Sequence, residues 1–147
     1  MTVRFLLVRV IEGGGCISAK PTNLRVRPIR QVYRSYGSQG VGYELLAQDE
    51  RAHSRMVLDC CWSPDGSFFA TASRDKSVKF WKQNPNSEWT AAGTIKMNES
   101  VTAAEMTSTP EGPLLAVGTE SGAISLYTIE AEGDSLAAKL VHDIQER

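Results

Sequence analysis

Three side chains of the types that form a nucleophilic triad lie close together in this sequence: His53, Ser73 and Asp75. In such a triad the histidine takes the proton of the serine hydroxyl, and the acid holds the imidazole in place. The surrounding residues include neither the glycine-flanked serine of a nucleophile elbow nor an oxyanion-hole motif. We therefore expect a structural hydrogen-bond network, and a small serine hydrolase is only a distant alternative.

The other candidates for chemistry are the cysteines and one glycine run. Cys60 and Cys61 are adjacent and Cys16 is the third cysteine, so the spacing suggests no disulfide framework. With only two histidines in the chain, no zinc-ligand spacing can be drawn. Residues 13–15 are glycines, but the lysine and hydroxyl residue of a phosphate-binding loop do not follow. We expect no enzyme activity, no cofactor and no metal.

Charge is unevenly distributed, although the formal net charge is −1. Residues 1–42 contain seven basic residues and one acidic residue, whereas residues 43–147 contain nine basic and sixteen acidic residues. We predict that residues 1–42 are a basic irregular arm with one short strand over 3–11. Basic arms can contact RNA phosphates, but no aromatic recognition module accompanies this one. We therefore expect nucleic-acid contact to be indirect at most, and the absence of a long apolar run argues against a membrane partner.

An internal repeat organises the rest of the chain. Residues 64–81, PDGSFFATASRDKSVKFW, align without a gap with residues 110–127, PEGPLLAVGTESGAISLY, at an offset of 46 (110 − 64). Apolar residues align with apolar residues, and turn residues align with turn residues. Self-similarity at such a period is typical of repeat architectures.

Each repeat unit has the pattern of four short strands joined by tight turns. In the PDG sequence, proline presets φ for the turn, aspartate can hydrogen bond to its own backbone, and glycine tolerates positive φ. We predict strands over 57–62, 68–73, 78–82 and 89–96 in the first unit, and over 101–106, 114–118, 123–129 and 136–144 in the second. Residues 43–48 would form the last strand of a preceding unit. The fold class is therefore all-β, built of antiparallel four-stranded meanders.

The first unit resembles a WD repeat at four polar positions. His53 precedes the first strand, Ser73 ends the second, Asp75 lies in the following turn and Trp81 lies in the third. In that family these side chains form a buried hydrogen-bonded chain that locks the blade. The resemblance implies the same structural role for His53, Ser73, Asp75 and Trp81.

The second unit departs from this pattern. Tyr127 replaces the tryptophan, Ser121 replaces the aspartate, and the histidine position falls near Asn98-Glu99. Thr119 keeps the hydroxyl. We expect the second unit to retain the fold of a blade without its hydrogen-bonded chain.

Longer runs are similar to the family of second subunits of the Elongator complex. They are HSR at 53–55, DC at 59–60, WSPDG at 62–66, SRDK at 73–76, VKFW at 78–81, LAVGTESG at 115–122 and ISLY at 124–127. The resemblance covers about residues 43–130. It implies an incomplete WD-repeat β-propeller over residues 43–147, with blade 1 at about 53–97 and blade 2 at about 99–147.

The same resemblance implies a function. The chain would be a non-catalytic scaffold that supports wobble-uridine modification of transfer RNA, in the cytoplasm and nucleus. Its partners would be the catalytic and large scaffold subunits of Elongator. The alternative is a WD-repeat adaptor of a ligase or chromatin complex.

Two blades are fewer than a closed propeller needs, since such rings contain about 4–8 blades. Unpaired edges and uncovered faces then remain. We predict that the isolated chain is marginally stable.

Overall fold

The computed structural model describes residues 5–10, 43–49 and 52–145, and side chains over residues 52–145. These residues form ten strands and no helix. The strands are β1 (Phe5–Val10), β2 (Tyr43–Asp49), β3 (Val57–Trp62), β4 (Phe68–Ser73), β5 (Ser77–Gln83), β6 (Trp89–Lys96), β7 (Val101–Thr109), β8 (Gly112–Thr119), β9 (Ile124–Glu132) and β10 (Ser135–Ile144). The all-β fold class is confirmed, and each predicted strand has a counterpart within a few residues.

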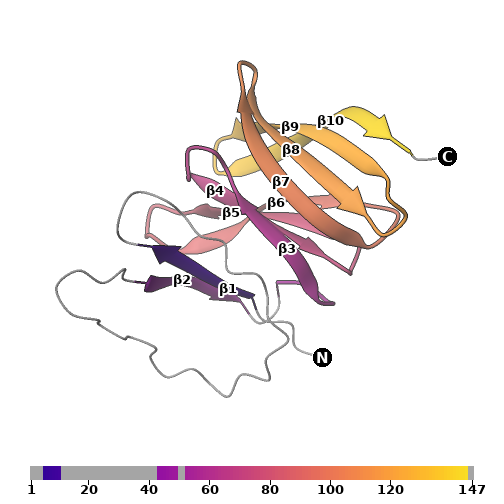
Figure 1. The fold of residues 1–147 in the computed structure, drawn as a ribbon. Helices are drawn as coiled ribbons and strands as arrows, with labels where there is room; N and C mark the ends of the chain where they lie inside the picture. Colours follow the sequence, from indigo (N-terminus) through magenta and orange to yellow (C-terminus); the bar gives the residue numbers. More distant parts are fainter. Residues whose placement is uncertain (1–4, 11–42, 50–51, 146–147) are drawn as a thin grey trace.

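The strands form three antiparallel sheets that lie in layers (Figure 1). A two-stranded sheet pairs β1 with β2. The first blade has the strand order β3-β4-β5-β6, and the second has β7-β8-β9-β10. The strands predicted over 3–11 and 43–48 thus pair with each other. The rest of the arm, residues 11–42, lies outside the described residues, and the predicted domain boundaries stay a prediction.

The turn between β3 and β4 follows from its residue types. Asp65 accepts a hydrogen bond from the hydroxyl of Ser63 at 2.7 Å, and the carbonyl of Ser63 accepts one from the amide of Gly66 at 2.9 Å. Gly66 has φ of 72°, a value that glycine adopts without steric penalty. The turn reverses the chain so that β4 pairs with β3.

Both faces of the first blade are covered, which explains why every residue of β4 is buried. Successive residues of a strand point to opposite faces. Phe68, Ala70 and Ala72 belong to the cluster between the two blades, whereas Phe69 belongs to a second cluster with Trp81. Phe80 and Trp81, which are adjacent in β5, likewise lie on opposite faces.

The main core lies between the two blades. It contains Cys61, Phe68, Ala70, Ala72, Val78, Phe80 and Ile95 of the first blade, and Val101, Ala104, Met106, Leu115, Val117, Tyr127, Ile129 and Leu136 of the second. β6 and β10 approach closely at Gly93, where an added Cβ would collide with the carbonyl oxygen of Leu136. Glycine at this position is what lets the two blades meet there.

The structure refines the repeat. β4 and β5 match β8 and β9 at the offset of 46, but Val57 pairs with Ser73 as Val101 pairs with Thr119. The first strands therefore match at an offset of 44 (101 − 57). The two offsets differ because the β7–β8 hairpin is longer than the β3–β4 hairpin. Eight residues (107–114) lie between the paired residues Met106 and Leu115, whereas six (63–68) lie between Trp62 and Phe69.

Edge strands and central strands differ in regularity. Each edge strand of the two blades has one residue without a partner in the register: Leu58 in β3, Ala92 in β6, Thr102 in β7 and Val141 in β10. The central pairs β4–β5 and β8–β9 have continuous register. Such bulges bend the strand and increase its local twist.

Candidate functional site

The polar residues that the sequence singles out meet on the face of the first blade that is turned away from the second. Nδ1 of His53 lies 2.9 Å from a carboxylate oxygen of Asp75, and Nε2 lies 2.7 Å from the hydroxyl of Thr71. The same hydroxyl accepts a hydrogen bond from the indole N–H of Trp81 at 2.9 Å. A continuous chain thus runs from Trp81 through Thr71 and His53 to Asp75.

With a neutral His53 ring, the donors and acceptors of this chain fit one arrangement of protons. An ionised carboxylate only accepts and an indole N–H only donates. The proton of a neutral His53 ring is therefore on Nδ1 and is donated to Asp75, so that Nε2 accepts from Thr71. The Thr71 oxygen is then free to accept from Trp81. A buried network in which every member is satisfied in this way stabilises one geometry of the blade.

Asp75 anchors the chain at the end of the blade. Its carboxylate also accepts hydrogen bonds from the amide of Ser54 at 3.0 Å, and from the amide and the hydroxyl of Ser77 at 3.1 and 2.5 Å. Burial alone would raise the pKa of Asp75, but the hydrogen bond from Ser77 and the neighbouring His53 outweigh it, and the pKa is lowered. The carboxylate is therefore ionised at neutral pH and ties the segment before β3 to the turn between β4 and β5.

Ser73 lies outside the chain. Its hydroxyl hydrogen bonds to the carbonyls of Arg55 and Met56 at 3.2 and 2.9 Å, and accepts from the amide of Asp75 at 3.1 Å. The hydroxyl that contacts His53 and Trp81 is that of Thr71, two residues earlier on the same face of β4. Ser73 is 0% exposed and His53 4%, so the geometry of a serine nucleophile beside an accessible imidazole is not present at these residues.

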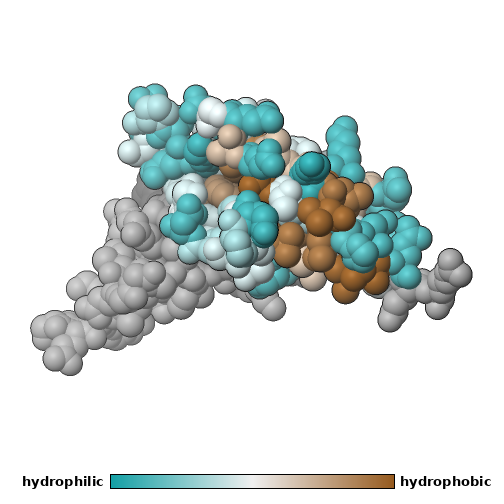
Figure 2. Space-filling model, turned by 90° about the horizontal axis from the view of Figure 1, so that it is seen from above, coloured by the Kyte–Doolittle hydropathy of each residue, from teal (hydrophilic) through white to brown (hydrophobic). Residues whose placement is uncertain are grey.

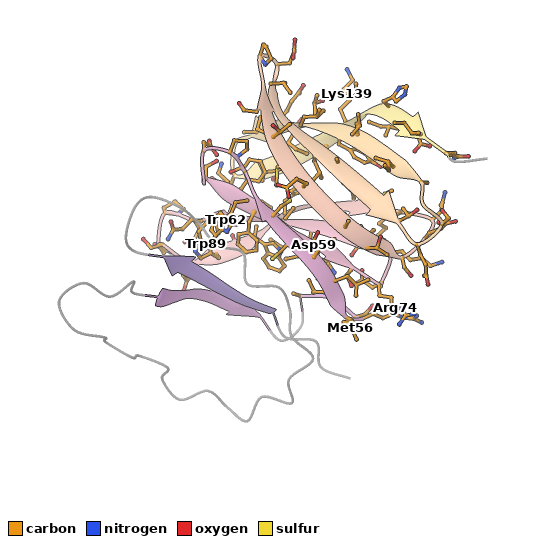
Figure 3. All side chains as sticks on the ribbon, viewed as in Figure 1. Met56, Asp59, Trp62, Arg74, Trp89 and Lys139 are labelled. Carbon is orange, nitrogen blue, oxygen red and sulfur yellow. The ribbon has the colours of Figure 1, made fainter. Side chains whose placement is uncertain are left out.

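Aromatic rings support the chain from the side. Phe69 stacks on Trp81 with ring centroids 6.1 Å apart, and it also contacts Trp62 and Trp89, both at 5.2 Å. Trp62 and Trp89 also contact each other, with ring centroids 5.4 Å apart (Figure 3). These rings shield the hydrogen bonds from water, which strengthens them.

The matching positions of the second blade carry apolar or weakly polar groups. Val117 takes the place of Thr71 at the offset of 46 (117 − 71), and Met97 takes that of His53 at the offset of 44 (97 − 53). Tyr127, which replaces Trp81, donates its hydroxyl proton to the sulfur of Met97 at 3.3 Å. The histidine position thus falls on Met97 rather than at Asn98-Glu99.

In the second blade a glutamate takes over the part played by Asp75, but it lies in a different connection between strands. The pKa of Glu99 is lowered, chiefly by a hydrogen bond from Ser121, which occupies the position of Asp75, and also by one from Thr119. In the first blade the carboxylate lies in the turn after β4, and in the second it lies in the segment before β7. In both blades the carboxylate links the segment before the first strand to the turn after the second strand.

Asp59 links the two blades through the main chain. One carboxylate oxygen accepts from the amide of Ala104 on β7 at 3.1 Å, and the other accepts from the amide of Cys60 at 2.9 Å. β3 and β7 therefore lie side by side (Figure 3). Sequence patterns did not indicate this role, because no feature of an isolated aspartate shows which strand of a neighbouring blade lies beside it.

Other groups with reactive side chains fit structural roles. Burial is the main factor that raises the pKa of the Cys61 thiol, which makes it a poor nucleophile. Among the residues described, no three histidine, cysteine, aspartate or glutamate side chains gather as metal ligands would. The same part of the chain has no helix with the length and apolar character needed to cross a membrane.

The comparisons with known proteins agree with this geometry. Residues 46–82, from β2 to β5, match the family "WD domain, G-beta repeat". A solved structure, Sqt1 of Saccharomyces cerevisiae, superposes with a TM-score of 0.54 at 25% identity over 65% of this chain and 25% of that protein. The chain therefore shares its fold with part of Sqt1.

Several relatives carry the name Elongator complex protein 2, and three of them are compared with this chain. The Drosophila melanogaster protein is 36% identical over 59% of this chain, the Schizosaccharomyces pombe protein 43% over 56%, and the Saccharomyces cerevisiae protein 35% over 69%. This chain covers 13%, 11% and 14% of their respective lengths. The chain carries a WD repeat, folds as two successive propeller-type blades and resembles Elongator complex protein 2 over more than half of its own length.

Proposed function

We propose that this chain is a non-catalytic scaffold segment of an Elongator-type complex, and that it supports wobble-uridine modification of transfer RNA without performing it. The observation that carries the proposal is the similarity to Elongator complex protein 2 at 35% to 43% identity, over 56% to 69% of this chain.

The chemistry of the blade supports a scaffold. Of the residues that could form a triad, His53 and Ser73 are buried, and His53 and Asp75 are engaged in the chain that fixes the first blade. A fold held in this way presents its loops and outer faces to other proteins, which is where binding residues concentrate. The proposed partners are the catalytic subunit and the large scaffold subunit of Elongator. The proposed compartments are the cytoplasm and the nucleus.

Affinity purification at native expression level tests the proposal. The chain, tagged at its C-terminus, is expected to recover the other Elongator subunits, as identified by mass spectrometry. Loss of the chain is expected to reduce modified wobble uridines in transfer RNA, as measured by nucleoside mass spectrometry. Recovery of ligase or chromatin subunits without Elongator would instead support the adaptor hypothesis.

A variant connects this function to the blade. Thr71→Val breaks the buried chain of the first blade, so it is expected to reduce both subunit recovery and uridine modification. Thr107→Val, at an exposed threonine of β7, serves as the matched control and is expected to behave like the original chain. Equal recovery by both variants would mean that the partners do not depend on the blade.

A further inference from the structure

The sulfur of Met97 accepts a hydrogen bond inside the second blade, at the position where the first blade has His53. The hydroxyl of Tyr127 donates to this sulfur at 3.3 Å, and the amide of Met97 donates to the carbonyl of Lys76 at 2.8 Å. Met97 is half-buried and packs against the core between the blades, whereas Tyr127 is a buried member of that core. The contact therefore joins the connection after β6 to the centre of the second blade.

The other methionines of the described chain lie in different surroundings. Met106 of β7 is 7% exposed, so a reagent in solution hardly reaches it while the chain is folded. Met56 is half-buried like Met97 and lies at the end of the first blade (Figure 3). Within residues 52–145 no hydrogen bond reaches its sulfur. Met97 thus combines partial exposure with a hydrogen-bonded sulfur.

This geometry makes the two lone pairs of the Met97 sulfur unequal. Either lone pair of a thioether can take up an oxygen atom, and the two products are epimers. One lone pair accepts from Tyr127. Burial raises the pKa of Tyr127, so the phenol keeps its proton and remains a donor at neutral pH. A reagent must break this hydrogen bond to reach the first lone pair, whereas the second lone pair needs no such step.

We propose that Met97 is a reversible oxidation site, at which a hydroperoxide adds oxygen to the lone pair that Tyr127 leaves free. With hydrogen peroxide, the sulfur attacks one peroxide oxygen and the O–O bond breaks. The leaving hydroxide takes the proton of the transferred oxygen, so the products are methionine sulfoxide and water. The sulfur loses two electrons and the peroxide gains them. This inference goes beyond the scaffold function and does not depend on it.

The sulfoxide weakens the second blade. Oxidation converts a flexible apolar side chain into a polar one, which disturbs an apolar contact. The sulfur now carries a partial positive charge, so it is a poor acceptor for the hydroxyl of Tyr127. A buried polar group that loses its partner costs stability. Oxidation of Met97 therefore loosens the contact between the blades.

The surface of the second blade makes this loosening consequential. Figure 2 views the molecule from above and shows an apolar region bordered by hydrophilic residues. A loosened blade adds core surface to a molecule that already exposes apolar groups, so oxidation also favours association. The large exposed apolar side chains are Ile124, Leu140, Val141 and Ile144.

The stereochemistry of the product tests the proposal. The full chain is treated with dilute hydrogen peroxide below its Tm and digested, and each methionine is followed by peptide-resolved mass spectrometry. The peptides are then reduced by methionine sulfoxide reductase A or B, each of which repairs one epimer. At Met97 one epimer is expected in an excess of about two- to tenfold, the ratio that corresponds to one hydrogen bond of about 0.5–1.5 kcal/mol.

Two controls make this test decisive. Tyr127→Phe keeps the ring and removes the hydroxyl, so the excess at Met97 should fall toward equal amounts. Met106 reports on folding and should stay unoxidised. Equal amounts of the two epimers in the original chain, or the same excess in Tyr127→Phe, would overturn the role of Tyr127. Oxidation of Met97 no faster than that of Met106 would overturn the site itself.

Thermal unfolding tests the effect on the blade. Peroxide treatment is expected to lower the Tm of the original chain by about 4–8 °C, the range for the loss of one buried interaction in a domain of this size, and treatment with the matching reductase should restore it. Met97→Leu conserves the side-chain volume and cannot form a sulfoxide, so it controls for oxidation at Met56 and at the cysteines. An equal fall of Tm in Met97→Leu would place the effect elsewhere and overturn the proposal.

Discussion

Thr71 occupies the central place in the polar chain of the first blade, because its hydroxyl accepts from Trp81 and donates to His53. The two interactions need one oxygen at a defined depth beneath the sheet surface. Valine has nearly the same shape but offers neither lone pair nor proton. The second blade shows the alternative. Val117 stands at this position, and the hydroxyl of Tyr127 hydrogen bonds to the sulfur of Met97 instead.

Replacement of Thr71 by valine is expected to lower the free energy of unfolding by about 1–3 kcal/mol, the usual effect when buried polar groups lose a hydrogen bond. Thr71→Ser keeps the hydroxyl and should recover most of this loss. Urea denaturation followed by circular dichroism measures both variants. A valine variant as stable as the original would show that the chain of hydrogen bonds contributes nothing.

Asp75 makes the stability of the blade depend on pH. Its pKa is lowered by folding from the ordinary value of 3.8, so its contribution is present above about pH 4 and is lost as pH falls through the lower folded value. Asp75→Asn should have a lower Tm than the original at pH 7, and the difference should shrink below pH 4. Melting curves between pH 7 and pH 2.5 test this. A difference that stays constant with pH would contradict it.

Sequence patterns identified three members of the polar chain and missed the fourth. Ser73 and Thr71 lie on the same face of β4, and both carry a small hydroxyl side chain. The choice between them depends on how far β4 and β5 are shifted along each other, because this shift sets which hydroxyl lies level with the indole of Trp81. The shift between the two strands cannot be predicted from residue types and spacing.

Among the elements, β6 and β10 depend on a glycine where they meet. The repeat pattern predicted both strands, but it gave no reason for Gly93, which lies inside β6 with no turn nearby. The reason is the backbone of Leu136 in the other blade. Strands could be predicted because alternation and turn residues are local signals, whereas the contacts between blades arise from residues distant in sequence.

Gly93→Ala is therefore expected to separate the two strands or distort one of them, at a cost of about 1–3 kcal/mol, which is typical of overpacking. Gly118→Ala is the matched control, since its added Cβ would lie 3.6 Å from the Cβ of Ala103, an ordinary contact. That variant should be unchanged or more stable by about 0.5 kcal/mol. Thermal unfolding monitored by calorimetry compares the two, and equal stability would contradict the close approach.

For the whole molecule, the core lies between two blades while the outer face of the second blade exposes large apolar side chains. We expect the isolated chain to unfold broadly, with Tm below about 45 °C, the lower end of the range for mesophilic domains. Calorimetry combined with sedimentation measures the transition and the state of association. A sharp transition at higher temperature in a monodisperse monomer would contradict this expectation.

The irregular edges of the blades have a consequence for how the chain meets other molecules. All four edge strands of the two blades contain an unmatched residue, while their central strands do not. Fibril growth requires a straight, regular strand onto which identical strands can be added, and a bulge removes that template. A chain with apolar faces but interrupted edges can therefore associate by stacking its sheets, and it resists conversion into cross-β fibrils while its native partners are absent.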